Sequence, residues 1–185
     1  MAGFKYRKSQ AGGGTTGDVV TFGVAAAHAT LLAPGDVVVI TGDANATTGV
    51  QEVDTGNATT LNTGVIESVD FTLSGETLTE TGLPASTAGT VKVRVDQYAL
   101  YEVDCDATLV VANAGLNCGI NVTTATKSGG LTVSNMTLDA ATVAVTQTLP
   151  FRIVALLEDD DGVLGNRALV RPNATTASDG AVGIA

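Results

Sequence analysis

The chain has 185 residues, of which 44% are hydrophobic, 4% aromatic and 15% charged, and its formal net charge is −10. A chain this acidic argues against nucleic-acid binding, because phosphate contacts need clustered Lys and Arg. The absence of Trp and the shortage of other aromatic residues argue against a sugar-binding cleft. No apolar run approaches the ~20 residues that span a bilayer, so we expect no membrane partner.

The first 17 residues are predicted to form an extended N-terminal arm. Basic and aromatic residues gather near its start, and a Gly-rich spacer over residues 11–17 follows them. After these basic residues, no Lys or Arg occurs before Lys92. The segment is interpreted either as a loose terminus or as a basic arm that meets an acidic partner. The second interpretation assigns partner contacts to Phe4, Lys5, Tyr6, Arg7 and Lys8.

The body of the chain is predicted to be all-β. Apolar and polar residues alternate in Val91–Asp96 and again in Tyr101–Asp106, which is the pattern of a half-buried strand. Pro34-Gly35-Asp36 before a Val run predicts a turn that leads into a strand. Other strands are expected near residues 18–24, 50–53, 64–73, 120–122, 131–133, 143–145, 149–157 and 168–170. A hairpin or edge ribbon is expected at residues 75–82. Residues 25–30 could form a short helical turn.

We therefore predict a single all-β domain over residues 18–172, built as a barrel or a sandwich. The arm of residues 1–17 precedes this domain, and a small polar tail over residues 173–185 follows it. The 185 residues are enough to bury a core, which must consist mainly of Val, Leu, Ile and Ala.

The sequence offers little for catalysis or metal binding. His28 is the one His, and no Gly-x-Ser-x-Gly motif accompanies it. Cys105 and Cys118 are the two cysteines, too few for a zinc site without further ligands. We interpret them as small core residues, with a single disulfide as the alternative. The expectation is a protein that is not an enzyme and has no cofactor and no metal.

Two acidic groups could bind a cation or a basic partner. Glu158–Gly162 is rich in carboxylates but lacks the spacing of a calcium-binding helix–loop–helix, so we interpret it as a solvated turn. Glu102, Asp104 and Asp106 alternate along one strand and therefore share a face. We expect that face to be wet, with a surface for a cation or an Arg-rich partner as the alternative.

One resemblance rests on the order of several segments along the chain. These segments are Leu32–Val38, Thr63–Ile66, Tyr101–Asp106, Asn113–Asn117 and Leu149–Leu156. Their order resembles the small proteins that decorate the capsids of tailed bacteriophages, often called decoration or cement proteins. The usual last segment of that pattern, a polar strand ending in Asn and His, is present only in part as residues 168–173.

The resemblance implies a β-rich, non-enzymatic virion protein, made in the host cytoplasm, that binds the outside of a capsid in many copies. Its expected partners are the major capsid protein, which it would bridge and reinforce, and neighbouring copies of itself, with a trimer as one form of homo-oligomer. The alternative class is a phage fibre or adhesin-type β domain that attaches to the host surface. A fibre typically shows repeats or a coiled-coil stem, and the sequence contains neither.

Overall fold

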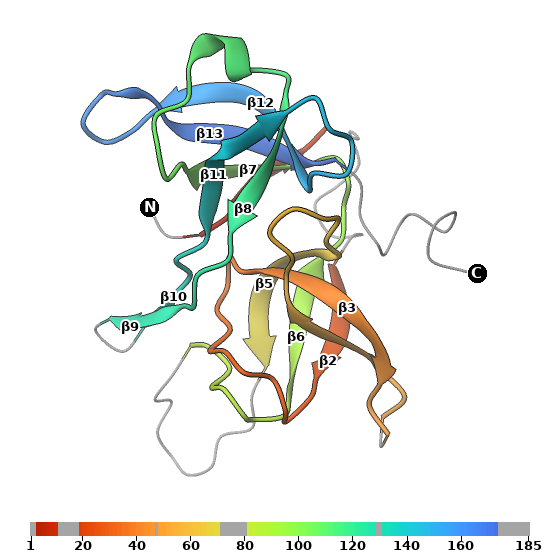
Figure 1. Cartoon of the computed structure of the whole chain (residues 1–185). Coiled ribbons are helices and arrows are strands. Elements are labelled where there is room, and N and C mark those ends of the chain that lie inside the picture. Colours follow the sequence, from red (N-terminus) through yellow and green to blue (C-terminus); the bar gives the residue numbers. More distant parts are fainter. Residues whose placement is uncertain (1–2, 11–18, 47, 71–80, 129–130, 174–185) are drawn as a thin grey trace.

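The computed structural model describes residues 3–10, 19–46, 48–70, 81–128 and 131–173. In this part of the chain the regular structure is β, with one short 3-10 turn and no α-helix. Figure 1 shows a closed barrel in its lower half and a larger sheet in its upper half. The all-β prediction is confirmed.

The closed barrel is formed by five strands in the order β2-β4-β3-β5-β6. They are β2 (Val19–Val24), β3 (Val37–Ala44), β4 (Gln51–Thr55), β5 (Gly64–Asp70) and β6 (Gly89–Arg94). The pairs are antiparallel except where Gly23 lies beside Glu52 in a parallel contact of β2 and β4. Because alternate residues of a strand point inward, Val91 and Val93 are fully buried in the barrel core.

The second body is a six-stranded sheet in the order β1-β7-β13-β12-β8-β11. Its strands are β1 (Lys5–Ser9), β7 (Ala99–Asp104), β8 (Asn117–Asn121), β11 (Thr137–Ala144), β12 (Phe151–Glu158) and β13 (Leu164–Pro172). All neighbouring strands are antiparallel. A parallel bridge between Cys105 and Leu138 brings β11 back beside the end of β7, so the sheet curves strongly.

Two smaller elements lie beside the sheet. The ribbon of β9 (Thr126–Ser128) and β10 (Leu131–Val133) stands off to one side in Figure 1. The 3-10 turn η1 (Val111–Asn113) lies at the top of the same view. Strand β10 was expected, but its partner β9 was not, because Thr-rich residues 123–130 look like a polar linker in the sequence.

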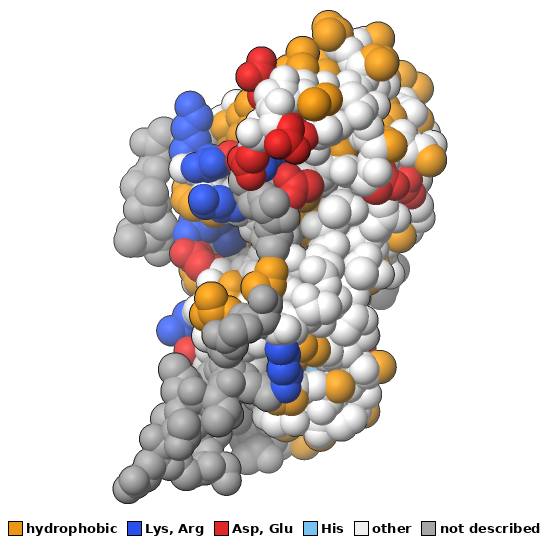
Figure 2. All heavy atoms as spheres, turned by 90° about the vertical axis from the view of Figure 1, so that its left-hand side faces the viewer, with side chains coloured by type: hydrophobic (Ala, Val, Ile, Leu, Met, Phe, Trp, Pro, Cys, Tyr) orange, Lys and Arg blue, Asp and Glu red, His pale blue; other side chains and the backbone are white. Residues whose placement is uncertain are grey.

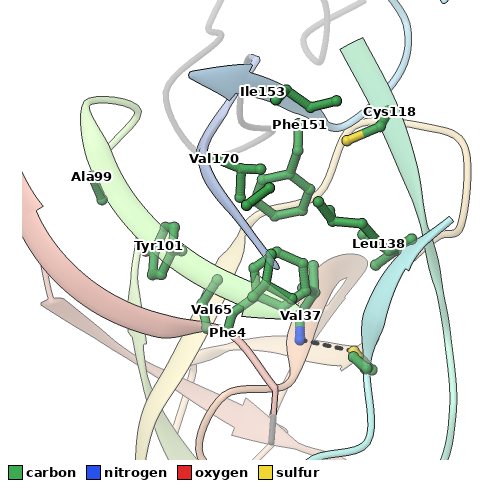
Figure 3. Packing of buried hydrophobic residues seen from close by; sticks show 14 of the residues in the cluster. Phe4, Val37, Val65, Ala99, Tyr101, Cys118, Leu138, Phe151, Ile153 and Val170 are labelled. Carbon is green, nitrogen blue, oxygen red and sulfur yellow. Dashed lines mark hydrogen bonds between the residues drawn. The ribbon is translucent and has the colours of Figure 1, made fainter. Parts of the chain in front are cut away.

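The sheet and the barrel share one hydrophobic core at their junction, shown in Figure 3. Phe4 stacks on Phe151 of β12 with ring centroids 4.7 Å apart. Val37 and Val65 of the barrel pack into the same cluster. The backbone N–H of Val37 donates a hydrogen bond of 3.2 Å to Met136 Sδ, marked by the dashed line. The two bodies are therefore held together by continuous apolar packing.

Most of the expected strands are present, and the remaining segments differ or lie outside the described residues. Residues 25–30 form a turn, in which His28 N–H donates to Ala25 O at 3.2 Å, and not a helical turn. Most of the expected ribbon at 75–82 and almost all of the tail at 173–185 lie outside the described residues.

The described part of the expected N-terminal arm is extended, but it belongs to the sheet. Residues Lys5–Ser9 form β1, whose register pairs Lys5 with Glu102 and Ser9 with Ala99. Phe4 is only 4% exposed. The expectation that this segment reaches away from the body is therefore corrected: the apolar contacts of Phe4 and the ladder with β7 tie residues 3–10 down.

Candidate docking face

The outer face of the six-stranded sheet gathers most of the basic residues of the chain. Alternation along β7 turns Tyr101 and Val103 into the core and Glu102 and Asp104 to the opposite face. Cross-strand register then identifies the other outward residues. We define the docking face as Lys5, Arg7, Lys8, Glu102, Asp104, Arg152, Ala155, Leu157, Arg167, Leu169 and Arg171.

One end of this face is cationic. Arg152 of β12 lies directly opposite Arg171 of β13, and Lys8 of β1 lies opposite Leu100 of β7. Because Val170 pairs with Tyr101, the next residue, Arg171, lies beside Leu100. Lys8, Arg171 and Arg152 therefore fall in one row across the sheet, which we call the cationic end.

The cationic end has no carboxylate partner among the residues that the structure describes. Within the described part of the chain, no carboxylate forms an ion pair with Lys8, Arg152 or Arg171. Like charges directly opposite each other on neighbouring strands are destabilising. An acidic group from outside the chain would relieve that repulsion.

The middle of the face contains a network of ion pairs around the buried side chain of Glu102. Glu102 is 6% exposed and accepts hydrogen bonds from the Arg7 guanidinium. On its other side, Arg167 Nη1 lies 3.4 Å from Glu102 Oε1, and Arg167 Nε lies 3.1 Å from Asp104 Oδ1. The expectation of a wet face is therefore wrong for Glu102, because two arginines from neighbouring strands cover its carboxylate.

The opposite end of the face is acidic. Arg167 Nη2 contacts Asp160 Oδ1 at 3.2 Å, which brings the loop after β12 to this face. Asp104, Asp160 and Asp161 line one hollow of about 410 Å³, and we call these three residues the acidic end. The expected turn at residues 158–162 is present, since Gly162 N–H donates to Asp159 O at 3.1 Å.

The acidic loop is held by its own hydrogen bonds. Asp159 accepts bonds from Asn166 Nδ2 at 2.7 Å and from the backbone N–H of Val163 at 2.8 Å. These bonds, led by the one from Asn166, hold the pKa of the Asp159 carboxyl below its ordinary value. In the described part of the chain, no three His, Cys, Asp or Glu side chains are arranged to hold a metal ion.

The distribution of charge sets this face apart from the rest of the protein. Six of the nine Lys and Arg residues of the chain lie on it, in a protein of net charge −10. Figure 2 shows Lys and Arg side chains gathered in a column in the upper half of the molecule, beside a group of Asp and Glu side chains. A partner that approaches this column meets positive charge on an otherwise acidic protein.

The five predicted contact residues divide into two groups. Lys5, Arg7 and Lys8 are exposed on the docking face. Phe4 and Tyr6 point the other way, and the Tyr6 ring packs under Arg94 at 3.9 Å from the guanidinium carbon to the ring centroid. These aromatic residues therefore anchor β1 to the protein itself, while the three basic side chains are presented to solvent.

Arg152, Arg167 and Arg171 were not predicted as members of this group. Their outward positions in period-two strands were a usable signal, because residues on either side of each are apolar or small. What was missing was the register that sets β1, β7, β13 and β12 side by side. Residues about 150 positions apart cannot be grouped without it.

Neither cysteine pairs with the other, and both thiols are poorly placed for chemistry. Cys105 and Cys118 are free, as interpreted from the sequence. Burial, reinforced by neighbouring acidic groups, raises the pKa of each thiol to about 12, so little thiolate exists near neutral pH. His28 is 3% exposed and is therefore a buried residue.

Comparisons with known proteins add no relative to this picture. No family model matches the chain, and no curated protein or solved structure shows a significant match. Among the helical turns of the described residues, none has the length and apolar character required to cross a membrane.

Proposed function

We propose that this protein is a non-enzymatic structural component of a phage virion that binds the outside of the capsid and reinforces it by bridging major capsid protein subunits. The observation that carries the proposal is the docking face, which concentrates six Lys and Arg residues on a protein of net charge −10. The order of segments that resembles capsid decoration proteins supports the same role.

In this role the docking face contacts an acidic surface, on the major capsid protein or on a neighbouring copy. Each exposed ion pair contributes at most about 1 kcal/mol. A repeated shell makes such weak contacts sufficient, because each bound subunit contacts several neighbours at once. The cationic end supports this assignment, since Arg152 and Arg171 lie opposite each other with no acidic partner in the described part of the chain.

The chemistry of the described residues favours binding over catalysis. The buried His28 ring is held by a contact of 2.9 Å between Nδ1 and Ala25 O, and its Nε2 makes no hydrogen bond to another described residue. The cysteines are protonated near neutral pH because burial raises the pKa of both thiols. We therefore assign the function to the surface of the sheet.

The test is binding of the purified protein to capsids assembled without it. Lys5→Glu combined with Lys8→Glu reverses two exposed charges on β1 and leaves Phe4 and the core intact. We expect this variant to occupy at least ~10-fold fewer sites at equal concentration, since two favourable contacts become repulsive. Lys92→Glu combined with Lys127→Glu changes the net charge equally, away from the docking face, and serves as the control.

Occupancy of the Lys5→Glu, Lys8→Glu variant equal to that of the control would remove the docking face from the proposal. Absence of binding by the unmodified protein to any capsid preparation would contradict the capsid role itself.

A further inference from the structure

The docking face is polarised along the direction of its strands. The cationic end of Lys8, Arg152 and Arg171 lies at one extreme, and the acidic end of Asp104, Asp160 and Asp161 at the other. Arg171 lies four positions along β13 from Arg167, the residue opposite Asp104, which corresponds to roughly 13 Å at ~3.3 Å per residue. The two opposite charges are thus well separated on one surface.

Between these ends, beside the ion-pair network around Glu102, the β12 and β13 part of the face is apolar. Ala155 lies opposite Leu169, and Leu157 lies opposite Arg167. None of these three apolar residues belongs to the buried core clusters, and all are partly exposed. An apolar centre with a charged rim is the usual anatomy of a protein–protein interface.

We infer that the occupant of the docking face is a second copy of this chain, paired face to face about a two-fold axis that lies parallel to the sheet and perpendicular to its strands, near Leu169. A two-fold axis there places the cationic end of each copy over the acidic end of the other. Every charged contact then occurs twice, as in any interface that uses the same patch on both subunits. The apolar centres meet on the axis itself.

The alternative occupant is an acidic surface of a different protein. Such a surface would match the cationic end but would leave the acidic end facing like charge. A second copy satisfies both ends with one geometry, and this is the reason for the choice.

Two copies that each have a net charge of −10 repel each other, but this repulsion acts over longer distances than the contacts between the two docking faces. At physiological ionic strength the screening length is about 8 Å, so charges on the barrels of the two copies are largely screened from each other. Contacts at the face are much closer and are less affected.

This inference rests on the proposed function only in taking the same face as the site of docking, and its test requires no capsid. The measurement is the sedimentation equilibrium of the purified full-length protein at physiological salt. Arg152→Glu with Arg171→Glu makes the cationic end negative, and Asp160→Lys with Asp161→Lys makes the acidic end positive.

We expect each double variant alone to self-associate at least ~10-fold more weakly than the unmodified protein, because both symmetric contacts become repulsive. An equimolar mixture of the two variants should regain dimers, since both contacts of the mixed pair are attractive again. This recovery does not depend on any change in fold, and circular dichroism of each variant establishes that the β fold is retained.

The charge-matched controls are Lys92→Glu with Lys127→Glu, and Asp43→Lys with Asp70→Lys, which lie on the barrel and the small ribbon. They should self-associate as the unmodified protein does, and mixing them should change nothing. A monomeric unmodified protein, or failure of the two face variants to recover dimers on mixing, would overturn the inference.

The two proposals fail separately. A monomer in solution that still binds capsids through the cationic end contradicts pairing and leaves the capsid role in place. A dimer that mixes as expected but binds no capsid supports pairing and contradicts the capsid role.

Discussion

Phe4 shows how one side chain decides whether the N-terminal segment is free or fixed. Its ring is 4% exposed, stacks on Phe151 and meets Tyr101 edge-on with centroids 6.2 Å apart. Its backbone N–H also donates to Gly35 O at 3.0 Å, in the turn before β3. One residue thus contacts both the sheet and the barrel.

We expect Phe4→Ala to lower the free energy of unfolding by about 3–5 kcal/mol, the usual cost of removing a buried aromatic ring. Lys5→Ala, one residue away and exposed, should change it by less than ~0.5 kcal/mol. Urea denaturation followed by circular dichroism measures both. Equal stability of the two variants would mean that Phe4 is not part of the core in solution.

Asp36 makes the junction sensitive to pH. Burial raises the pKa of its carboxyl to about 6, although hydrogen bonds, including the 2.7 Å bond from Ala33 N–H to Oδ2, oppose the shift. The folded protein therefore holds the Asp36 proton more tightly than the unfolded chain does. The contribution of this group to stability is favourable below about pH 4 and is lost as the pH rises toward 6.

We expect Asp36→Asn, which cannot ionise, to lack this loss. The stability of the unmodified protein relative to the variant should fall between pH 4 and pH 7 by on the order of 3 kcal/mol, since one pKa unit corresponds to ~1.4 kcal/mol. Parallel urea titrations at both pH values give the difference. A constant difference across this range would show that Asp36 titrates normally in the folded state.

At the scale of the elements, β1 and β7 are joined by charge as well as by backbone pairing. Glu102 lies between Arg7 of β1 and Arg167 of β13, and its side chain is 8% exposed. Arg167 also reaches Asp104 and Asp160. This network fixes the side chains at the centre of the docking face before any partner arrives.

Glu102→Gln should therefore cost about 1–3 kcal/mol of stability, because two arginines lose a shared, nearly buried counter-charge. Asp70→Asn, in the half-exposed pair with Lys92, should cost less than about 1 kcal/mol and is the control. A double-mutant cycle of Glu102→Gln with Arg7→Gln should show coupling of at least ~0.5 kcal/mol. Additive effects would indicate that the Arg7–Glu102 contact contributes nothing.

The sequence predicts individual strands better than it predicts which strands lie next to one another. Strands such as β6 and β7 follow from alternation of Val with polar residues, and the turn before β3 follows from Pro34-Gly35-Asp36. Polar residues of strand patterns were expected to be wet, yet Arg94 and Glu102 are 5% and 6% exposed. Their burial comes from packing between distant strands, which local periodicity does not contain.

For the whole molecule, the docking face is a product of topology. The strand order places β1, from the beginning of the chain, next to β7, with β7 and β13 lying between it and β12. Only that order brings Lys8 into one row with Arg171 and Arg152. The basic residues at the start of the chain correctly indicated a cationic surface. The sequence could not show that half of the basic residues of the docking face come from the C-terminal strands.

The measurement that tests the central claim most directly is an electron cryo-microscopy map of the virus particle that carries this protein. The account predicts many copies on the outer surface of the capsid, each with the face of β1, β7, β13 and β12 buried against another protein chain. A particle in which this protein is absent from the capsid surface, or is placed in a tail fibre, would contradict the account. So would capsid-bound copies whose Lys8, Arg152 and Arg171 all face open solvent.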